Sequence, residues 1–440
     1  MSVESNPQIH LIEAELDALG EWLLPAAQDL PAPIQAVAQR LWLDTLSCAW
    51  AGLRADELMR WLQVAHMGDA GHISLPGTHL KFSAGAAVTA LAMGACWDEA
   101  CEGLALAHGR PGVPIVAALW SQLASSKPNW QALWRATAVG YEVAGRLGAR
   151  LRIKPGMHVD GVWGAFGAAA AVVHLRGGTW IDIQRALQAC AVQLPFTLYK
   201  PIEQGKNVRN MYLGHSAWLG LQAANAVAAD LATPAGAIDN FAGLALDQSN
   251  AGSWPAAGQW LISHSYWKPF AAVRHVHYGA QAALTLRSQL PALERIDELH
   301  LTTYAEALQY CSNRAPQTVL AAQFSLSFGV AAALVFGDLS PNEFRAPRFL
   351  SSNTRRLEAL ISIQSDAAMF LADRRGARLS ARIGQQWWHV DQGPVIGDAG
   401  HQPDQQAVLR KYTQFTQSDP LMALWFKQVM TDDLHSTVRF

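Results

Sequence analysis

The stretch "MHVDGVWGAFGAAAAVV", residues 157–173, joins a histidine and an aspartate to a run of glycine and alanine. Gly164 and Gly167 carry no side chain, so a helix that contains them lets another backbone approach closely. We therefore expect a tightly packed helix here. Asp160 is a favourable N-cap residue, and we expect it to cap this helix. His158 would then lie just outside the helix N-terminus.

Apolar residues recur with a helical period in other segments of the first half of the chain. These segments are "PIQAVAQRLWLDTLSCAWAGL" (33–53), "SAGAAVTALAMGACWDEA" (83–100) and "DIQRALQACAVQL" (182–194). The pattern predicts that this part of the chain is all-helical.

The pattern changes near "SWPAAGQWLISHSYWKPF" (253–270), beyond which short runs typical of strands occur. They are "ELHLTTY" (298–304), "ALISIQ" (359–364), "ARLSARI" (377–383) and "QWWHVD" (386–391), mixed with helices such as "FSLSFGVAAALVFG" (324–337). Helical spacing returns in "DQQAVLRKYTQF" (404–415), which we expect to pack back on the first part. The sequence thus predicts a mainly α protein with a smaller α+β domain.

Composition narrows the classes of partner. Half of the 440 residues are hydrophobic and 15% are charged, which indicates extensive burial and favours a homo-oligomer. A net charge of -2 without a basic run argues against nucleic acid. The acidic, polar N-terminus is unlike a signal peptide and no long apolar run occurs, so we expect a cytoplasmic protein that does not enter membranes. Five cysteines without a CxxC pair are expected to be reduced core residues: Cys48, Cys96, Cys101, Cys190 and Cys311.

Histidines precede small-residue helices at two further places. His108 stands before "PGVPIVAALW" (111–120), and His275 and His277 stand before "YGAQAALTL" (278–286). A helix N-terminus attracts carboxylates, and an imidazole there can bind the anion and exchange a proton with it. With Arg110 and Arg274 nearby, the set indicates one pocket for a substrate with more than one carboxylate. The alternative for each histidine is an ordinary hydrogen-bonded residue of the core or surface.

Other interpretations of these residues have less support. His275 and His277 form an HxH pair, which could hold a metal ion together with His108 or His264. Acidic residues that could serve as further ligands are absent nearby in the sequence. The glycines of residues 161–167 follow no predicted strand, which argues against a dinucleotide site. Asp98 and Glu99 could be a solvated pair at a helix end. The basic residues of the stretch 146–154 could form a solvated face or a rim that attracts an anionic substrate.

Seven motifs occur in the order and at about the spacing of the MmgE/PrpD family, which the chain resembles over nearly its whole length. That family includes 2-methylcitrate dehydratase, cis-aconitate decarboxylase and iminodisuccinate epimerase. The motifs are "LWLDTLSCAWAGL" (41–53), "WDEACEGLALAHGRPGVPIVAAL" (97–119), "GYEVAGRLG" (140–148), "HVDGVWGAFGAAAAVVHLRG" (158–177), "YLGHSAWLGLQAANAVAADLA" (212–232), "KPFAAVRHVHYGAQAAL" (268–284) and "QFSLSFGVAAALVFG" (323–337).

The resemblance implies an architecture and an assembly. A large all-helical domain is expected from residues 1–264 and 403–440 together, with an α+β lid domain of residues 265–402 inserted between them. A homodimer without metal or organic cofactor is also implied.

The resemblance further implies a set of site residues. The catalytic positions of the family match Asp98, His108, His158 and His277. A lysine of decarboxylase and epimerase members is replaced by Arg209, which we expect to clamp a carboxylate because arginine is a poor proton donor. The family's tyrosine is Phe328 here, and its Asp-Asp-Thr run is "DEACE" (98–102). Substrate binding is expected from Arg209, Lys206, Arg274, His275 and Tyr212.

The function implied by these residues is proton abstraction from a carbon next to a carboxylate of a small di- or tricarboxylate. We expect a lyase, and a dehydratase in particular. Epimerase or decarboxylase activity is the alternative within the family. A non-catalytic carboxylate-binding homologue is the alternative outside enzymes, because the lysine, tyrosine and Asp-Asp-Thr positions are replaced.

Overall fold

The computed structural model describes residues 11–371 and 374–438. The first ten residues, which contributed to the prediction about a signal peptide, lie outside this range. None of the helices in the described ranges is both long and apolar enough to cross a membrane. The five cysteines are buried and form no disulfide, as the sequence predicts.

Helices dominate the chain up to residue 245. They are α1 (Leu11–Gln28), α2 (Ala32–Leu53), α3 (Asp56–Gly68), α4 (Ala84–Trp97), α5 (Gly112–Trp120), α6 (Leu123–Ser126), α7 (Trp130–Arg150), α8 (Gly164–Leu175), α9 (Trp180–Ala191), α10 (Lys200–Glu203), α11 (Met211–Ala228) and α12 (Ala237–Ala245). The three segments with helical spacing correspond to α2, α4 and α9, so these predictions are confirmed.

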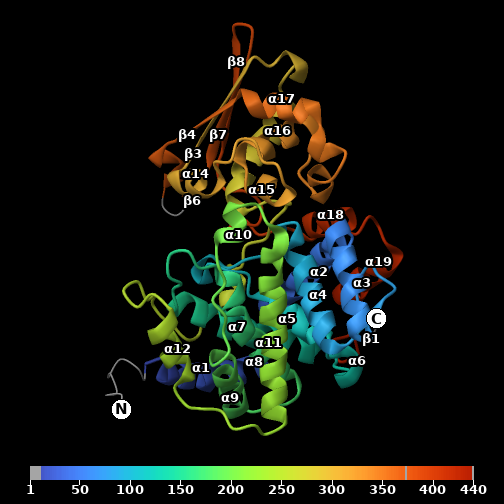
Figure 1. Cartoon of the computed structure of the whole chain (residues 1–440), viewed down its shortest axis with the longest axis vertical. Coiled ribbons are helices and arrows are strands. Elements are labelled where there is room, and N and C mark those ends of the chain that lie inside the picture. The colour runs from blue at the N-terminus through green and yellow to red at the C-terminus, as the bar shows by residue number, and fades with distance from the viewer. Residues whose placement is uncertain (1–10, 372–373, 439–440) are drawn as a thin grey trace.

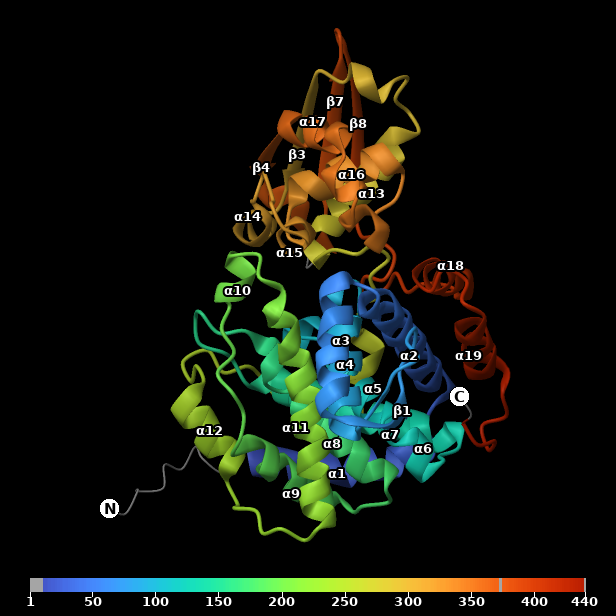
Figure 2. The same ribbon diagram turned by 45° about the vertical axis from the view of Figure 1, so that its right-hand side comes forward.

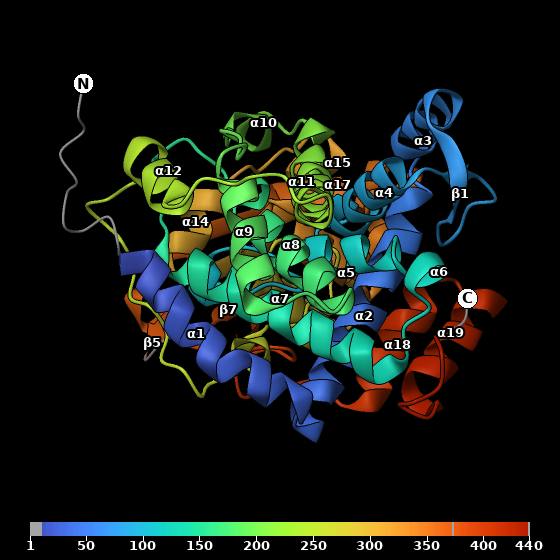
Figure 3. The ribbon, with the colours of Figure 1, turned by 90° about the horizontal axis from the view of Figure 1, so that it is seen from below.

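The small-residue helix α8 lies in the middle of this bundle, against α5, α7, α9 and α11 (Figures 1 and 3). A Cβ on Gly167 would lie 2.8 Å from the carbonyl oxygen of Gly140 in α7. A Cβ on Gly220 of α11 would lie 2.6 Å from that of Ala165. The glycines are therefore needed for close helix packing, as the sequence indicates.

The capping role expected of Asp160 is wrong. Asp160 lies in a short 3-10 turn, Val159–Gly161, and Trp163 is the residue that precedes α8. The carboxylate of Asp160 binds Arg110 and Arg209 instead of the helix terminus. Two guanidinium groups from distant segments thus take the place of the local backbone donors.

The first half of the chain is not all-helical. β1 (Ala70–Ser74) pairs with β2 (Lys81–Phe82) in an antiparallel hairpin between α3 and α4. Most of β1 is exposed, so its side chains lack the apolar alternation by which a strand is recognised in sequence.

The remaining strands form one four-stranded sheet in the order β4-β3-β7-β8. β3 (Glu298–Thr303) runs parallel to β4 (Ile361–Ser365) and antiparallel to β7 (Ala377–Ile383), which pairs with β8 (Gln386–Gln392). Alternate residues of β3 are buried, which is why the strand was recognisable. All four strands match predicted runs. Two short strands, β5 (Phe370–Leu371) and β6 (Arg374–Arg375), pair beside this sheet.

Helices accompany the sheet at one end of the molecule (Figures 1 and 2). They are α13 (His277–Arg287), α14 (Ala305–Cys311), α15 (Val319–Gln323), α16 (Leu326–Phe336) and α17 (Ser352–Leu360), of which α13 contacts β7 and β8. The last helices, α18 (Gln405–Phe415) and α19 (Pro420–Thr431), return to the helical part and pack beside α2, as expected (Figure 2). The fold is therefore mainly α with a smaller α+β part.

Candidate active site

Two buried carboxylates and three buried cations meet where the loop after α4 contacts the loops before α8, α11 and α13. The Oε1 atom of Glu99 accepts a hydrogen bond from Arg110 Nη1 at 3.0 Å, and Arg209 Nη2 contacts the same oxygen. Lys268 Nζ lies 3.5 Å from the second oxygen of Glu99 and donates to its main-chain oxygen at 2.7 Å. We call Glu99, Asp160, Arg110, Arg209 and Lys268 the ion network.

Asp160 is the second carboxylate of the ion network. It pairs with Arg110, and Arg209 Nη1 lies 3.1 Å from its Oδ2. Burial works against ionisation of Asp160, but the charge and hydrogen bond of Arg110 act in the opposite direction, together with His158 and Lys268, and the net effect lowers the pKa. Asp160 is therefore charged at neutral pH, and the fully ionised network has a surplus of one positive charge.

Lys268 differs from the two arginines in how easily it loses its proton. Its side chain is 2% exposed, and burial lowers its pKa from 10.5 to about 7, with help from the positive charges of Arg110 and Arg209. An amine with this pKa is neutral in about half of the molecules at neutral pH and can accept a proton. Lys268 is the base-competent member of the ion network.

Glu99 adopts the left-handed backbone conformation, with φ of 54°. A non-glycine residue is strained in this conformation, and the surrounding contacts must offset the strain. His108, at φ of 53°, is held in the same way at the end of a short turn before α5. Both strained residues lie in the loop between α4 and α5, and the contacts of Glu99 with the three cations are among those that offset its strain.

His158 lies beside the ion network, with its side chain 11% exposed and Nδ1 3.8 Å from Asp160 Oδ2. Its Nδ1 accepts a hydrogen bond from the backbone N–H of Asp160 at 3.1 Å. Burial lowers the pKa of this imidazole, so the neutral form is favoured. Since Nδ1 accepts, the single proton of the neutral ring is on Nε2. His158 is thus arranged to donate a hydrogen bond through Nε2.

A row of aromatic rings joins His158 to His275. The ring of His158 lies 5.9 Å from Tyr199 and 5.9 Å from Tyr212, and Tyr199 lies 6.2 Å from Tyr310 of α14. Tyr310 stacks on His275 at 5.7 Å. The row connects the helical bundle to the sheet-bearing part, and we call the boundary between these two parts the seam. Two of the predicted histidines, His158 and His275, therefore lie at the seam.

A cavity of about 650 Å³ lies between the same two parts and includes two other predicted residues, Asp98 and Lys206. Asp98 is buried and accepts from Arg345 Nη2 at 2.7 Å. Gln323 is 0% exposed, and its Oε1 has no hydrogen-bond partner in the described part of the chain. The polar or charged residues that line the cavity include Arg54, Asp56, Glu57, Asp98, Lys206, Asn207, Asn210, Thr318, Gln323 and Arg345.

His108 lies near the sheet-bearing part but does not line the cavity. His108 as a whole residue is exposed, but partial burial of its imidazole lowers the pKa, and the positive charge of Arg152 lowers it further. The charges that act on it include Glu306 and Arg375, which follow β3 and precede β7. The expected helix after it begins at Gly112, so this prediction of local structure is confirmed.

His277 lies in the core and not at the seam. It is 0% exposed, its Nε2 is 3.0 Å from the carbonyl oxygen of Ala272, and its ring packs on Phe270. Burial holds its pKa well below the ordinary value. The structure therefore does not bring His277 together with His158.

The other expected substrate-binding residues have partners within the protein. Arg209 is 0% exposed and serves Glu99 and Asp160, while Arg274 pairs with Asp398 and donates to the Trp267 carbonyl at 3.0 Å. Tyr212 donates to the Leu198 carbonyl at 3.0 Å, and Lys206 is exposed at the cavity.

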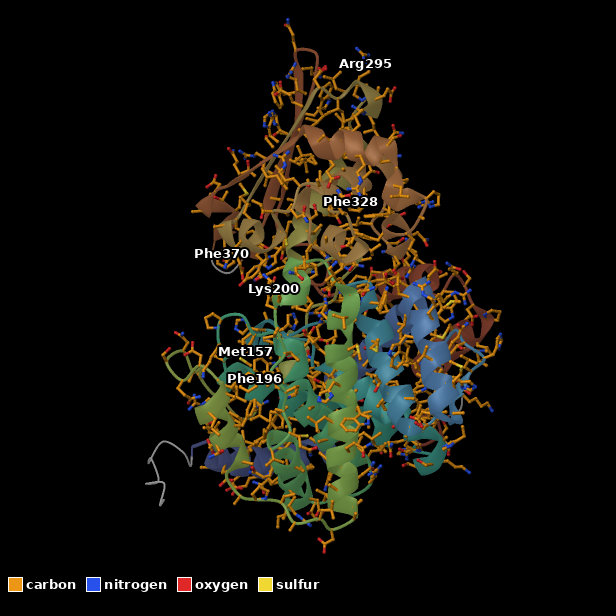
Figure 4. All side chains as sticks on the ribbon, viewed as in Figure 1. Met157, Phe196, Lys200, Arg295, Phe328 and Phe370 are labelled. Carbon is orange, nitrogen blue, oxygen red and sulfur yellow. The ribbon has the colours of Figure 1, made fainter. Side chains whose placement is uncertain are left out.

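Phe328, at the position of the family's tyrosine, lies inside the sheet-bearing part (Figure 4). Its ring packs against those of Phe344 and Phe349, 5.4 and 5.6 Å away. The residue therefore belongs to an apolar cluster in this structure.

Three residues with prominent contacts were not among the predicted site residues. Lys268 was quoted in the "KPF" motif without a role, and a lysine within an otherwise apolar stretch was the available signal. Glu99 was considered part of a solvated pair, yet it is 2% exposed. Arg345 carries no local signal, because only the fold brings it to Asp98.

Within residues 11–371 and 374–438, no three histidine, cysteine or acidic side chains gather as a metal site would require. The two residues of the HxH pair diverge. His275 Nδ1 lies 2.7 Å from the Tyr304 hydroxyl, whereas His277 points into the core.

Comparison with known families places this geometry in context. The MmgE/PrpD N-terminal domain matches residues 23–253, and the MmgE/PrpD C-terminal domain matches residues 270–417. A search of curated proteins finds no match. The two matched domains cover most of the chain, including every member of the ion network but Lys268, which lies between them. The chain belongs to the MmgE/PrpD family.

Proposed function

We propose that the protein is a lyase that removes a proton from a carbon next to a carboxylate of a small di- or tricarboxylate, and that it acts as a dehydratase. Membership of the MmgE/PrpD family supports dehydratase-like or related lyase activity. The observation that carries the proposal is Lys268, an amine with a pKa of about 7 that contacts Glu99, the carboxylate that Arg110 and Arg209 also bind.

The charge balance supports an anionic substrate. With Lys268 protonated, the ion network has one more cation than carboxylates. In the neighbouring cavity, the cations Arg54, Lys206 and Arg345 are matched in number by Asp56, Glu57 and Asp98. A negative charge that develops on a substrate carboxylate is stabilised when fixed cations already face it. Carboxylates are therefore the ligand class that these surroundings favour.

The two proton-handling groups have different roles in this proposal. Neutral Lys268 takes the proton from the carbon next to the carboxylate. The electron pair moves onto that carboxylate, opposite the positive charge that Lys268 gains with the proton. His158 donates a hydrogen bond from Nε2 to the hydroxyl group on the adjacent carbon. That hydroxyl leaves as water with the proton returned by Lys268, and the carbon–carbon double bond forms.

Access to Lys268 requires a movement, because its side chain is buried. We propose that residues 265–402 act as a lid domain over a helical domain built from residues 1–264 and 403–440. The row of rings from His158 to His275 and the cavity at Asp98 both cross the boundary between these segments. Opening at this seam would admit the substrate, and closing would exclude water from the reaction. Arg209, in this arrangement, orients Glu99 and Asp160 and does not clamp the substrate.

A binding protein without catalysis is the second candidate. One observation favours it: Arg209 and Phe328 replace the family's lysine and tyrosine, and neither side chain is an effective proton donor. Within catalysis, an epimerase would use the same base and then return a proton to the carbon. A decarboxylase would instead break the bond to CO2 and would need protonated Lys268 to give a proton to the carbon.

A panel of substrates separates these functions. Purified protein is incubated with citrate, methylcitrate, aconitate and aspartate-derived acids, and products are followed by NMR. A dehydratase yields an alkene signal or, in reverse, consumes one, whereas an epimerase changes only configuration and a decarboxylase releases CO2. Turnover that persists unchanged in Lys268→Met would contradict the assigned base. Saturable binding of these acids without turnover would establish the binding protein.

A further inference from the structure

Lys411, near the C-terminal end of α18, is a second buried lysine close to the site. Its side chain is 4% exposed. Nζ pairs with Asp44 of α2 and donates to the carbonyl oxygen of Ala100 at 2.7 Å. Although burial works against its charge, Asp44 raises the pKa of Lys411, so it stays protonated. A permanent buried cation from the far end of the chain thus binds the loop that contains Glu99.

The same ammonium also contacts the segment that contains Lys268. Nζ lies 5.0 Å from the centre of the Trp267 ring and 5.1 Å from that of Phe415. Cations are attracted to aromatic faces at such distances. Trp267 directly precedes Lys268 in the chain. Lys411 therefore contacts a neighbour of Glu99 on one side and a neighbour of Lys268 on the other.

Asp44 completes the attachment of the loop. Its Oδ2 accepts the backbone N–H of Glu102 at 3.1 Å, so Asp44 and Lys411 together hold both the carbonyl of Ala100 and the N–H of Glu102. These residues follow Glu99, which has a strained left-handed backbone. Strain of this kind persists only where neighbouring contacts fix the chain.

We propose that Lys411 is a positioning residue. It binds the backbone of Ala100 and the ring of Trp267, and so keeps Lys268 Nζ at its distance of 3.5 Å from the Glu99 carboxylate. The inference rests on the proposed function in one respect, namely that Lys268 takes part in the reaction. It implies that the C-terminal helix α18 is needed for turnover as well as for stability, through contacts of Lys411 with Asp44, Ala100 and Trp267.

The test uses the paired variant Asp44→Asn with Lys411→Met. Removing both charges avoids leaving one buried charge without its partner, which would unfold the chain for an unrelated reason. The introduced asparagine can still accept from the N–H of Glu102, and the introduced methionine still packs on Trp267, but the bond to Ala100 is lost. Lys427→Met is the matched control, because Lys427 lies on the next helix, α19, and is exposed.

Hydrogen–deuterium exchange tests the positioning without reference to any substrate. In the paired variant, peptides that cover residues 98–104 should exchange about five- to tenfold faster, as loss of one buried hydrogen bond predicts, while peptides of α8 stay unchanged. Unchanged exchange in residues 98–104 would overturn the inference even if no substrate is ever found. Uniformly faster exchange throughout the protein would overturn it as well, since it would indicate general destabilisation.

Kinetics test the consequence for catalysis. With a substrate identified from the panel, kcat should fall roughly 10- to 100-fold in the paired variant with KM within twofold, because small displacements of a reacting group reduce turnover strongly. Lys411→Arg alone, which keeps the donors, should recover part of kcat, and Lys427→Met should match the wild type.

If exchange accelerates but kcat is unchanged, positioning by Lys411 is refuted. If the wild-type protein turns over nothing, the proposed function fails and the exchange data alone decide the inference. Should the paired variant fail to fold, Asp44→Asn with Lys411→Leu, which also removes both charges and the bond to Ala100, is judged by the same two measurements.

Discussion

Replacing Lys268 with methionine is expected to make the protein more stable and far less active. Folding buries the ammonium group and lowers its pKa from 10.5 to about 7. At about 1.4 kcal/mol per pKa unit, keeping the amine in the folded protein at pH 7 costs about 4 kcal/mol. Methionine has a similar length and avoids this cost.

The net gain is smaller than that, because the variant also loses a hydrogen bond. The carbonyl oxygen of Glu99, which accepts from Lys268 Nζ at 2.7 Å, would be left without this donor, at a cost of about 1–3 kcal/mol. We therefore expect a net stabilisation of about 1–3 kcal/mol at pH 7, which corresponds to a melting temperature a few degrees higher. Activity should fall by roughly two to four powers of ten, the usual contribution of a general base.

The pH dependence gives the sharper test. Between pH 7 and 10.5 the unfolded chain still holds the proton that the folded protein has released, so the stability of the wild type rises with pH across this window. The advantage of Lys268→Met should shrink over the same window and be lost by about pH 10, where the cost of keeping the amine is about 1 kcal/mol and no longer exceeds that of the lost hydrogen bond. Paired melting curves of the two proteins at pH 7 and pH 10 measure this difference.

Lys411→Met serves as the contrast, since the pKa of Lys411 is raised by Asp44. Removing this lysine leaves a buried carboxylate unpaired and should destabilise the protein by about 3–5 kcal/mol. If Lys268→Met is also less stable than the wild type at pH 7, or if its stability relative to the wild type does not change with pH, the reasoning about Lys268 is refuted.

Three other outcomes follow from the site. His158→Gln should reduce turnover by roughly two to four powers of ten with an unchanged melting temperature, and an effect on KM alone would remove His158 from the chemistry. Arg209→Lys should lower the melting temperature, because a lysine cannot bridge Glu99 and Asp160 as the guanidinium does; raised KM at unchanged stability would instead mark Arg209 as a substrate clamp. Activity should persist in the presence of a metal chelator. Elemental analysis that finds about one zinc or iron per chain, removed by the chelator together with activity, would contradict this expectation.

The secondary structure was largely predictable because local burial governs it. The alternation in residues 298–303 and the helical repeat in residues 33–53 record which side chains face the core. The hairpin at residues 70–82 was missed because its side chains are mostly exposed. Asp160 was assigned as a cap from its neighbours in sequence, whereas Arg110 and Arg209, both distant in sequence, decide its contacts.

The site was predictable only in part, because its partners are far apart in the chain. Lys268 contacts Glu99 across 169 residues, and Arg345 reaches Asp98 across 247. The histidines at helix starts were recognisable locally, and the structure places His158 and His275 on one row of rings. His277 has the same local pattern but lies in the core, since the first turn of α13 directs it inward.

Solvent exchange at the substrate carbon tests the central claim most directly. The protein is incubated in deuterated water with each acid of the panel, and NMR follows deuterium at the carbon next to a carboxylate. We predict incorporation for at least one acid, with a rate that rises as pH increases through about 7, because the neutral form of Lys268 is the base. Lys268→Met should abolish the exchange. Absence of exchange with every acid that binds, or exchange that survives in Lys268→Met, would contradict the account.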